Sequence, residues 1–120
     1  MPITYLEKIL DINGHKAFLE ANIKDVLVTG NLTIVRLDDG QTHGQGDRSM
    51  NRNVLALDQE ANVVWKIQEA PHGGDEWPKP YTHLAMQGTK LVASNWIGVD
   101  YVVDLTTGNV DTGKSGGRPW

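Results

Sequence analysis

Short apolar and β-branched runs, separated by glycine, asparagine and aspartate, recur along most of this chain, while helical spacing is weak almost everywhere. Where the pattern is clearest, side chains alternate with a period of two, which is typical of a strand with two different faces. The alternating sets are Thr33, Val35 and Leu37 in one run and Val63, Trp65 and Ile67 in another. We therefore expect an all-β protein, and we assign Trp65 to its core.

Tight-turn signals separate the predicted strands. Each consists of two residues, at least one of which tolerates a positive φ. The pairs are Asn13-Gly14, Gly30-Asn31, Gly88-Thr89 and Gly108-Asn109. Their regular placement favours short antiparallel connections over helices.

The first 23 residues allow two interpretations. Thr4 and Glu7 have the spacing of a capping box, which would begin a helix. The turn pair Asn13-Gly14 lies between two apolar-polar stretches, which favours a β-hairpin over residues 3–23. We predict the hairpin, and we expect it to add to one sheet edge, because soluble proteins cover or charge unpaired edges.

An internal repetition is the most informative feature of the sequence. Gly30 and Gly88, 58 residues apart, each separate two apolar runs, and Leu57 and Val103, 46 residues apart, each end a run before an aspartate. The two offsets differ because the first copy has a longer connection. We predict two four-stranded antiparallel units packed together in one domain, at residues 24–68 and 81–112, followed by a tail at 113–120. Such a repeat length with four strands per copy is typical of propeller blades.

The segment 53–58 (Asn-Val-Leu-Ala-Leu-Asp), followed by Val63-Val64-Trp65, resembles the repeat of quinoprotein-type (PQQ-like) β-propellers. The segment 103–108 resembles the same repeat. In the first copy Ala61 occupies the position of the turn glycine, and in the second Asp111 and Thr112 occupy the position of the tryptophan. The resemblance implies blade-like sheets, but two blades cannot close the ring that holds a quinone, so we expect no cofactor.

In such units the long connections meet at one end of the sheets and the tight turns at the other. The long connections are 41–52 and 69–80, and the turn at 97–98 falls at the same end. Long loops on a rigid scaffold are where binding residues concentrate. We therefore predict a surface there that binds a partner or ligand. Its candidate residues are His43, Arg48, Arg52, His72, Trp77, Tyr81 and Trp96.

Catalytic interpretations have weaker support. His43, His72 and His83, with Asp75 and Glu76, are ligand types for zinc or iron, but their spacing matches no ligand motif. Carboxylates in glycine-rich loops are mostly surface charge. We predict neither a metal site nor a catalytic residue, and the alternative is a small-ligand or metal-dependent enzyme that uses the loop His, Asp, Glu and Arg residues.

The composition of the chain excludes some classes of partner. The 120 residues carry 11 basic and 15 acidic side chains, a net charge of -4, and no cysteine. An acidic chain argues against a nucleic-acid partner, and the longest apolar run, four residues at 54–57, is far short of the roughly 20 that a membrane span needs. The lack of cysteine fits a reducing compartment.

We therefore expect a cytoplasmic, non-enzymatic module with a protein partner and with no nucleic-acid or membrane partner. Among the expected functions we include an immunity or antitoxin-like role, because a small acidic protein can bind and block a basic toxin. A homodimer is expected if one sheet edge stays uncovered.

Overall fold

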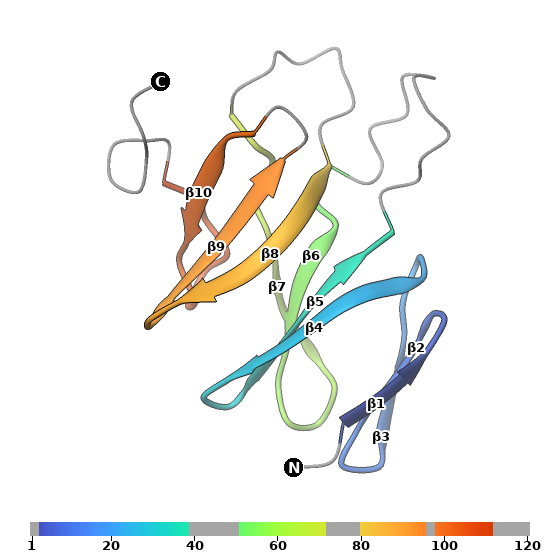
Figure 1. Ribbon diagram of the computed structural model, residues 1–120. Helices are drawn as coiled ribbons and strands as arrows, with labels where there is room; N and C mark the ends of the chain where they lie inside the picture. Colours follow the sequence, from blue (N-terminus) through green and yellow to red (C-terminus); the bar gives the residue numbers. More distant parts are fainter. Residues whose placement is uncertain (1–2, 39–50, 72–79, 96–97, 112–120) are drawn as a thin grey trace.

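The computed structural model describes residues 3–38, 51–71, 80–95 and 98–111, and within these ranges it contains strands and no helix. The strands form three antiparallel sheets, which confirms the all-β prediction (Figure 1). The N-terminal sheet contains β1 (Ile3–Leu6), β2 (Ile9–Ile12) and β3 (His15–Phe18). The middle sheet contains β4 (Ile23–Thr29), β5 (Leu32–Leu37), β6 (Val54–Leu57) and β7 (Val63–Lys66). The C-terminal sheet contains β8 (Tyr81–Gln87), β9 (Lys90–Asn95) and β10 (Asp100–Val103).

The middle sheet buries side chains on both of its faces. Ile34 and Ala56 pack in one apolar cluster with residues of the C-terminal sheet. Val35 and Leu55 pack in a second cluster with residues of the N-terminal sheet. This two-sided burial explains why all four residues of β6 are apolar and buried, because neither set of alternating side chains meets water.

The N-terminal segment differs from its prediction in two respects. It forms a three-stranded sheet with two turns, at Glu7-Lys8 and Asn13-Gly14, instead of a single hairpin. This sheet also packs on a face of the middle sheet instead of adding to an edge, since Leu10 and Ile12 are fully buried against it. Burying an alternating apolar face removes far more apolar surface from water than pairing one strand would. The expected hairpin turn is present, with positive φ at Asn13 and Gly14 as a type I′ turn requires.

The predicted repetition is visible in the strand pairing. Every residue pair between β4 and β5 from Asp25↔Arg36 onward recurs 58 residues later between β8 and β9. The β-bulge between Ile23 and Asp25 likewise recurs between Tyr81 and His83. The pairs of β5 with β6 recur between β9 and β10, with offsets of 58 and 46. The corresponding pairs are Thr33↔Leu57 with Leu91↔Val103, and Arg36↔Val54 with Ser94↔Asp100.

Among the residues that the structure describes, the second copy has three strands and not the four predicted. In place of a fourth strand the described residues show one isolated antiparallel bridge, Val103↔Val110. At the offset of 46, the counterpart of Trp65 is Asp111, so the second copy lacks the large apolar side chain that anchors β7. The described residues include no helix long and apolar enough to cross a membrane.

Trp65 is buried between the middle and C-terminal sheets, as predicted. Its indole Nε1 donates a hydrogen bond to the carbonyl oxygen of Leu105 at 2.9 Å, so the polar edge of the ring is satisfied inside the protein. The end of the first copy is in this way attached to the last turn of the second.

Candidate functional site

The strand ends from which the long connections leave lie at one end of the molecule. Leu37 ends β5 next to Asn53, which precedes β6, and the N–H of Leu37 donates to the carbonyl oxygen of Asn53 at 2.8 Å. Tyr81 begins β8 opposite Asn95, the last residue of β9. The connections themselves, 39–50 and 72–79, lie outside the described residues. We call this part of the molecule the connection end; it is uppermost in Figure 1.

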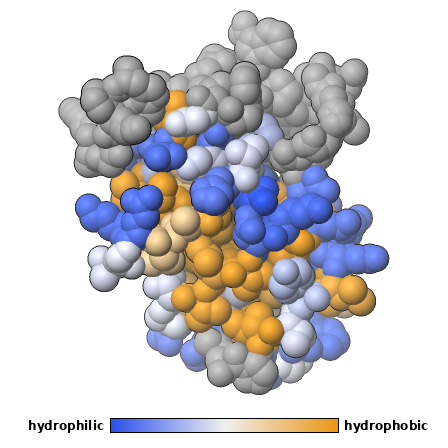
Figure 2. Space-filling model, viewed as in Figure 1, coloured by the Kyte–Doolittle hydropathy of each residue, from blue (hydrophilic) through white to orange (hydrophobic). Residues whose placement is uncertain are grey.

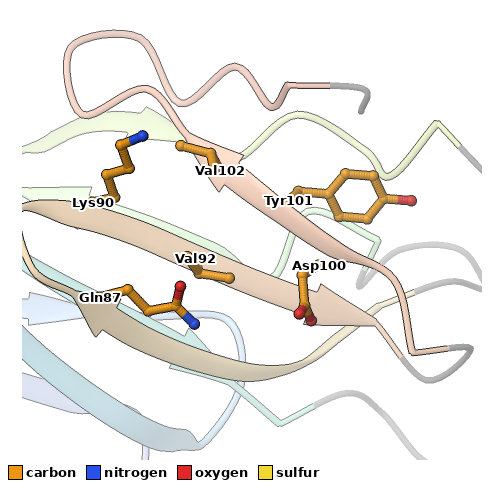
Figure 3. A pocket seen from close by; sticks show the side chains of 6 residues that line it. All are labelled: Gln87, Lys90, Val92, Asp100, Tyr101 and Val102. Carbon is orange, nitrogen blue, oxygen red and sulfur yellow. The ribbon is translucent and has the colours of Figure 1, made fainter. Parts of the chain in front are cut away.

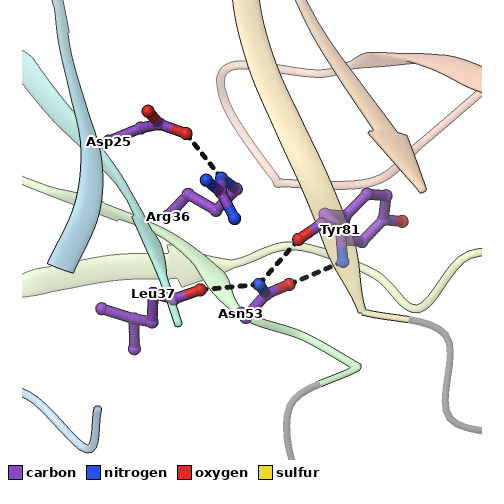
Figure 4. Close-up of polar contacts among 5 residues, drawn as sticks. All are labelled: Asp25, Arg36, Leu37, Asn53 and Tyr81. Carbon is purple, nitrogen blue, oxygen red and sulfur yellow. Dashed lines mark hydrogen bonds and ion pairs between the residues drawn. The ribbon is translucent and has the colours of Figure 1, made fainter. Parts of the chain in front are cut away.

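A single buried amide joins three chain segments at the connection end. The Nδ2 of Asn53 donates to the carbonyl oxygens of Leu37 and Tyr81, both at 2.9 Å, and its Oδ1 accepts from the N–H of Tyr81 at 2.9 Å (Figure 4). Asn53 is only 1% exposed, so these bonds are shielded from water. The end of β5, the start of β6 and the start of β8 are therefore held in fixed relative positions.

Two of the predicted site residues, Arg52 and Tyr81, hold the chain just after β7. Arg52 donates from Nε to the carbonyl oxygen of Ile67 at 2.9 Å and from Nη2 to that of Lys66 at 3.3 Å. The Tyr81 hydroxyl donates to the carbonyl oxygen of Gln68 at 2.7 Å. Three consecutive carbonyl groups are thus satisfied by these two side chains, which fixes the start of the connection between β7 and β8.

Tyr81 is a core residue in the structure and is not on a surface loop. Its side chain is fully buried and meets the ring of Tyr101 edge-on, with ring centroids 6.2 Å apart. Burial raises the pKa of Tyr81 far above its ordinary value, because the charged phenolate would lose its hydration. Tyr81 therefore stays neutral and acts as a hydrogen-bond donor and packing residue.

Sequence reasoning missed the buried amides at this end. Besides Asn53, the side chains of Asn51 and Asn95 are buried, and the Oδ1 of Asn95 accepts from the N–H of Val99 at 3.3 Å. Gln68 accepts at Oε1 from the N–H of Val110 at 2.8 Å, which ties the end of the second copy to the first. Asn53 immediately precedes β6 and Asn95 is the last residue of β9, so both lie at the end of an apolar strand.

The other predicted site residues lie outside the described residues, so the structure neither groups them nor separates them. They are His43, Arg48, His72, Trp77 and Trp96. Among the described residues, no group of three or more His, Cys, Asp or Glu side chains is placed to hold a metal ion. His83 is described, and it is an exposed residue of β8.

A hollow of about 160 Å³ lies on the C-terminal sheet (Figure 3). Its lining includes Lys90 and Asp100, one cationic and one anionic residue, together with Val92 and Val102. Asp100 already accepts a hydrogen bond from the Ser94 hydroxyl at 2.5 Å. The hollow lies on the outward face of the C-terminal sheet, between Asp100 at the start of β10 and Lys90 at the start of β9.

Comparisons with known proteins place the chain in a family but give no function. The sequence model of one family, described as a domain of unknown function (DUF7957), matches residues 1–114. No curated protein matches the chain. Among solved structures, the crystal structure of the computationally designed Ika8 protein is similar, with 12% identity and a TM-score of 0.39. The match covers 90% of this chain and 46% of the designed chain, so this chain spans about half the length of that protein.

Proposed function

This chain belongs to the family described as a domain of unknown function (DUF7957), and we propose that it is a non-enzymatic module that binds a protein partner at the connection end. The observation that carries the proposal is the Asn53 amide, which fixes the bases of two long connections at one buried point. A rigid base beneath long connections is how many folds present binding residues.

The charge of the chain supports a basic partner. With a net charge of -4, the module attracts positively charged proteins over a distance set by the ionic strength. A protein that blocks a basic toxin, as an immunity protein or antitoxin does, has this property. We also propose that the protein is cytoplasmic, because a chain without cysteine fits a reducing compartment.

The two copies also support a blade-like origin. We interpret them as quinoprotein-type repeats, because they share their strand register and because Trp65 of the first copy packs at the last turn of the second. In this interpretation the repeats supply the scaffold, and the quinone chemistry of complete propellers plays no part in the function.

The experiment that tests the proposed function compares two double variants as bait in capture from native lysate. In the first, Arg48→Ala with Trp77→Ala changes residues of the long connections. In the second, Gln59→Ala with Thr89→Ala changes uncharged, exposed turn residues at the opposite end of the sheets, so the charge that attracts a basic partner is kept. We expect both variants to melt within about 2 °C of the wild type. Only the first should lose the captured protein, and capture should weaken as salt rises.

Two results would contradict the proposal. Equal capture by both variants would show that the connections are not the binding surface. Loss of capture by the turn variant alone would move the binding surface to the opposite end of the sheets. If the connection variant unfolds, the single variants Arg48→Lys and Trp77→Phe, which change the side chains less, test the capture with a folded protein.

A further inference from the structure

The stack of three sheets has two outward faces, one on the N-terminal sheet and one on the C-terminal sheet. Because of the internal repeat, the outward face of the C-terminal sheet can be compared with the face of the middle sheet that packs against the C-terminal sheet. Ile34 and Ala56 of the middle sheet pack toward the C-terminal sheet. At the repeat offsets their counterparts are Val92 and Val102, which belong to the outward face of the C-terminal sheet. That outward face therefore corresponds, position by position, to a sheet-docking surface.

On that face, charged residues stand beside Val92 and Val102 at positions that are apolar in the first copy. Leu32 packs against the core in the first copy, but its counterpart is the exposed Lys90. Val54 is fully buried, but its counterpart is Asp100. Docking a further sheet there would bury both charges, which is costly. A polar outer face is what terminal repeats of stacked proteins need, so the stack ends at this face.

The opposite end of the stack has the reverse character. Leu6 pairs with Ile9, and Ile9 pairs with Phe18, so the three side chains form one row across the N-terminal sheet. Leu10 and Ile12 point into the core, and strand alternation places this row on the outward face. Leu6 is 71% exposed and Phe18 is 74% exposed. Figure 2 shows apolar side chains gathered over the lower half of the molecule, where this sheet and β4 lie.

We propose that a second copy of this chain packs on the Leu6–Ile9–Phe18 row, face to face about a two-fold axis. Beside the row, Asp11 and Lys16 form an ion pair at 2.8 Å on the same face, so the face presents both signs of charge. Two copies with a net charge of -4 each repel each other. The Asp11–Lys16 pair is neutral as a whole, so this face does not add to the repulsion. In a two-fold dimer each Asp11 can also meet Lys16 of the second copy.

The alternative head-to-tail arrangement would place the row on the outward face of the C-terminal sheet. Lys90 and Asp100 oppose it, because an apolar row packed on them would remove water from both charged side chains. The proposed face consists of three four-residue strands. It is smaller than the roughly 800 Å² per partner of a standard interface, so we expect a weak dimer that forms as concentration rises.

The lack of cysteine in the chain makes a direct test possible. Thr4→Cys introduces one thiol on the N-terminal face, and Gln87→Cys introduces one on the C-terminal face. Under mild oxidation at high protein concentration, we expect the Thr4→Cys protein to form a disulfide dimer with itself. The Gln87→Cys protein should stay monomeric. Preferential cross-linking between the two variants in a mixture would show head-to-tail packing and overturn the proposal.

Sedimentation velocity over a range of concentrations supplies the second measurement. Phe18→Ser removes the most exposed side chain of the row, and Val64→Ser removes an exposed side chain elsewhere as the matched control. We expect Phe18→Ser to raise the dimer Kd by about tenfold or more, and Val64→Ser to leave it unchanged. A wild type that stays monomeric at millimolar concentration, or equal effects of the two variants, would overturn the proposal.

Discussion

The indole ring of Trp65 lies directly on the backbone of Gly108. A methyl group added at Gly108 would be 2.6 Å from Cε3 of Trp65 and 2.9 Å from the carbonyl oxygen of Lys66, closer than a Cβ atom comes to other non-hydrogen atoms in folded proteins. Gly108 also has a φ of 81°, which disfavours any side chain. The contact joins the last strand of the first copy to the last turn of the second.

Gly108→Ala should therefore be the most damaging turn substitution in this protein. The left-handed φ alone costs about 1 to 2 kcal/mol, and the displaced ring adds a further 1 to 3 kcal/mol or so. Gly88→Ala is the matched control, because Gly88 has a φ of 65° but open space around the added methyl group. Urea unfolding of the two variants should differ by the cost of moving Trp65. Equal losses of stability would show that the Trp65 contact is loose.

Asn53→Ala should destabilise the protein by about 2 to 4 kcal/mol, because it removes three buried hydrogen bonds and leaves their backbone partners shielded from water. Gln59→Ala, which removes an exposed side chain with one 3.3 Å bond to Asn31, should change stability by less than about 0.5 kcal/mol. Hydrogen exchange at the N–H of Tyr81, which donates to Oδ1 of Asn53, should rise selectively in Asn53→Ala, whereas the N–H of Leu37 keeps its backbone acceptor. Unchanged exchange at Tyr81 would contradict the role assigned to Asn53.

Asp58 should make the wild type lose stability in acid. Its Oδ1 accepts from the N–H groups of Asn62 and Glu60, both at 2.9 Å, and these bonds, that to Asn62 first, lower the pKa of Asp58 below its ordinary value of 3.8. A lowered native pKa stabilises the fold above the unfolded pKa, and this contribution is lost as pH falls through the native value.

Asp58→Asn keeps an acceptor oxygen but does not titrate, so its stability should fall less than that of the wild type between about pH 5 and pH 2. The pKa of Asp11 is also lowered, chiefly by its hydrogen bond to Lys16, but both proteins share this group. Urea unfolding at a series of pH values measures the difference. If the free energy of unfolding fell equally with pH in the two proteins, Asp58 would not be the cause of the acid sensitivity.

Ala61→Gly should raise stability slightly. Ala61 has a φ of 66°, which costs an alanine about 1 kcal/mol or more relative to glycine. The gain is offset in part, because glycine loses more backbone entropy on folding and the methyl group packs against the apolar cluster that contains Leu10 and Ile12. We expect a net gain of about 0.5 kcal/mol in thermal or chemical unfolding. A clear loss would mean that the packing of the methyl group outweighs the backbone strain.

The sequence carried enough information to predict most of the strands and turns and the duplication, because these depend on local alternation and on glycine. The turn at Glu7-Lys8 was missed because neither residue signals a turn, although Glu7 adopts a φ of 55°. The placement of the N-terminal sheet was missed for a different reason. Alternation shows that Leu10 and Ile12 form an apolar face, but the partner of that face depends on contacts far away in the chain.

The candidate site was less accessible to prediction than the fold. Tyr81 was predicted as a binding residue at the connection end, yet its counterpart 58 residues earlier is Ile23, which is buried in the first copy. The repeat itself therefore contained the signal that Tyr81 is a core residue. The Asn53 contacts join residues 16 and 28 positions apart, and no local pattern specifies such bonds.

The duplicated bulge has a consequence for how this protein behaves when it is crowded. β4 and β8 each lie at one edge of their sheets and, at seven residues each, are the longest strands described. The irregular register near the start of each interrupts the row of free N–H and C=O groups that an incoming chain would use as a template. Fibril growth by strand addition is thereby discouraged at these two edges.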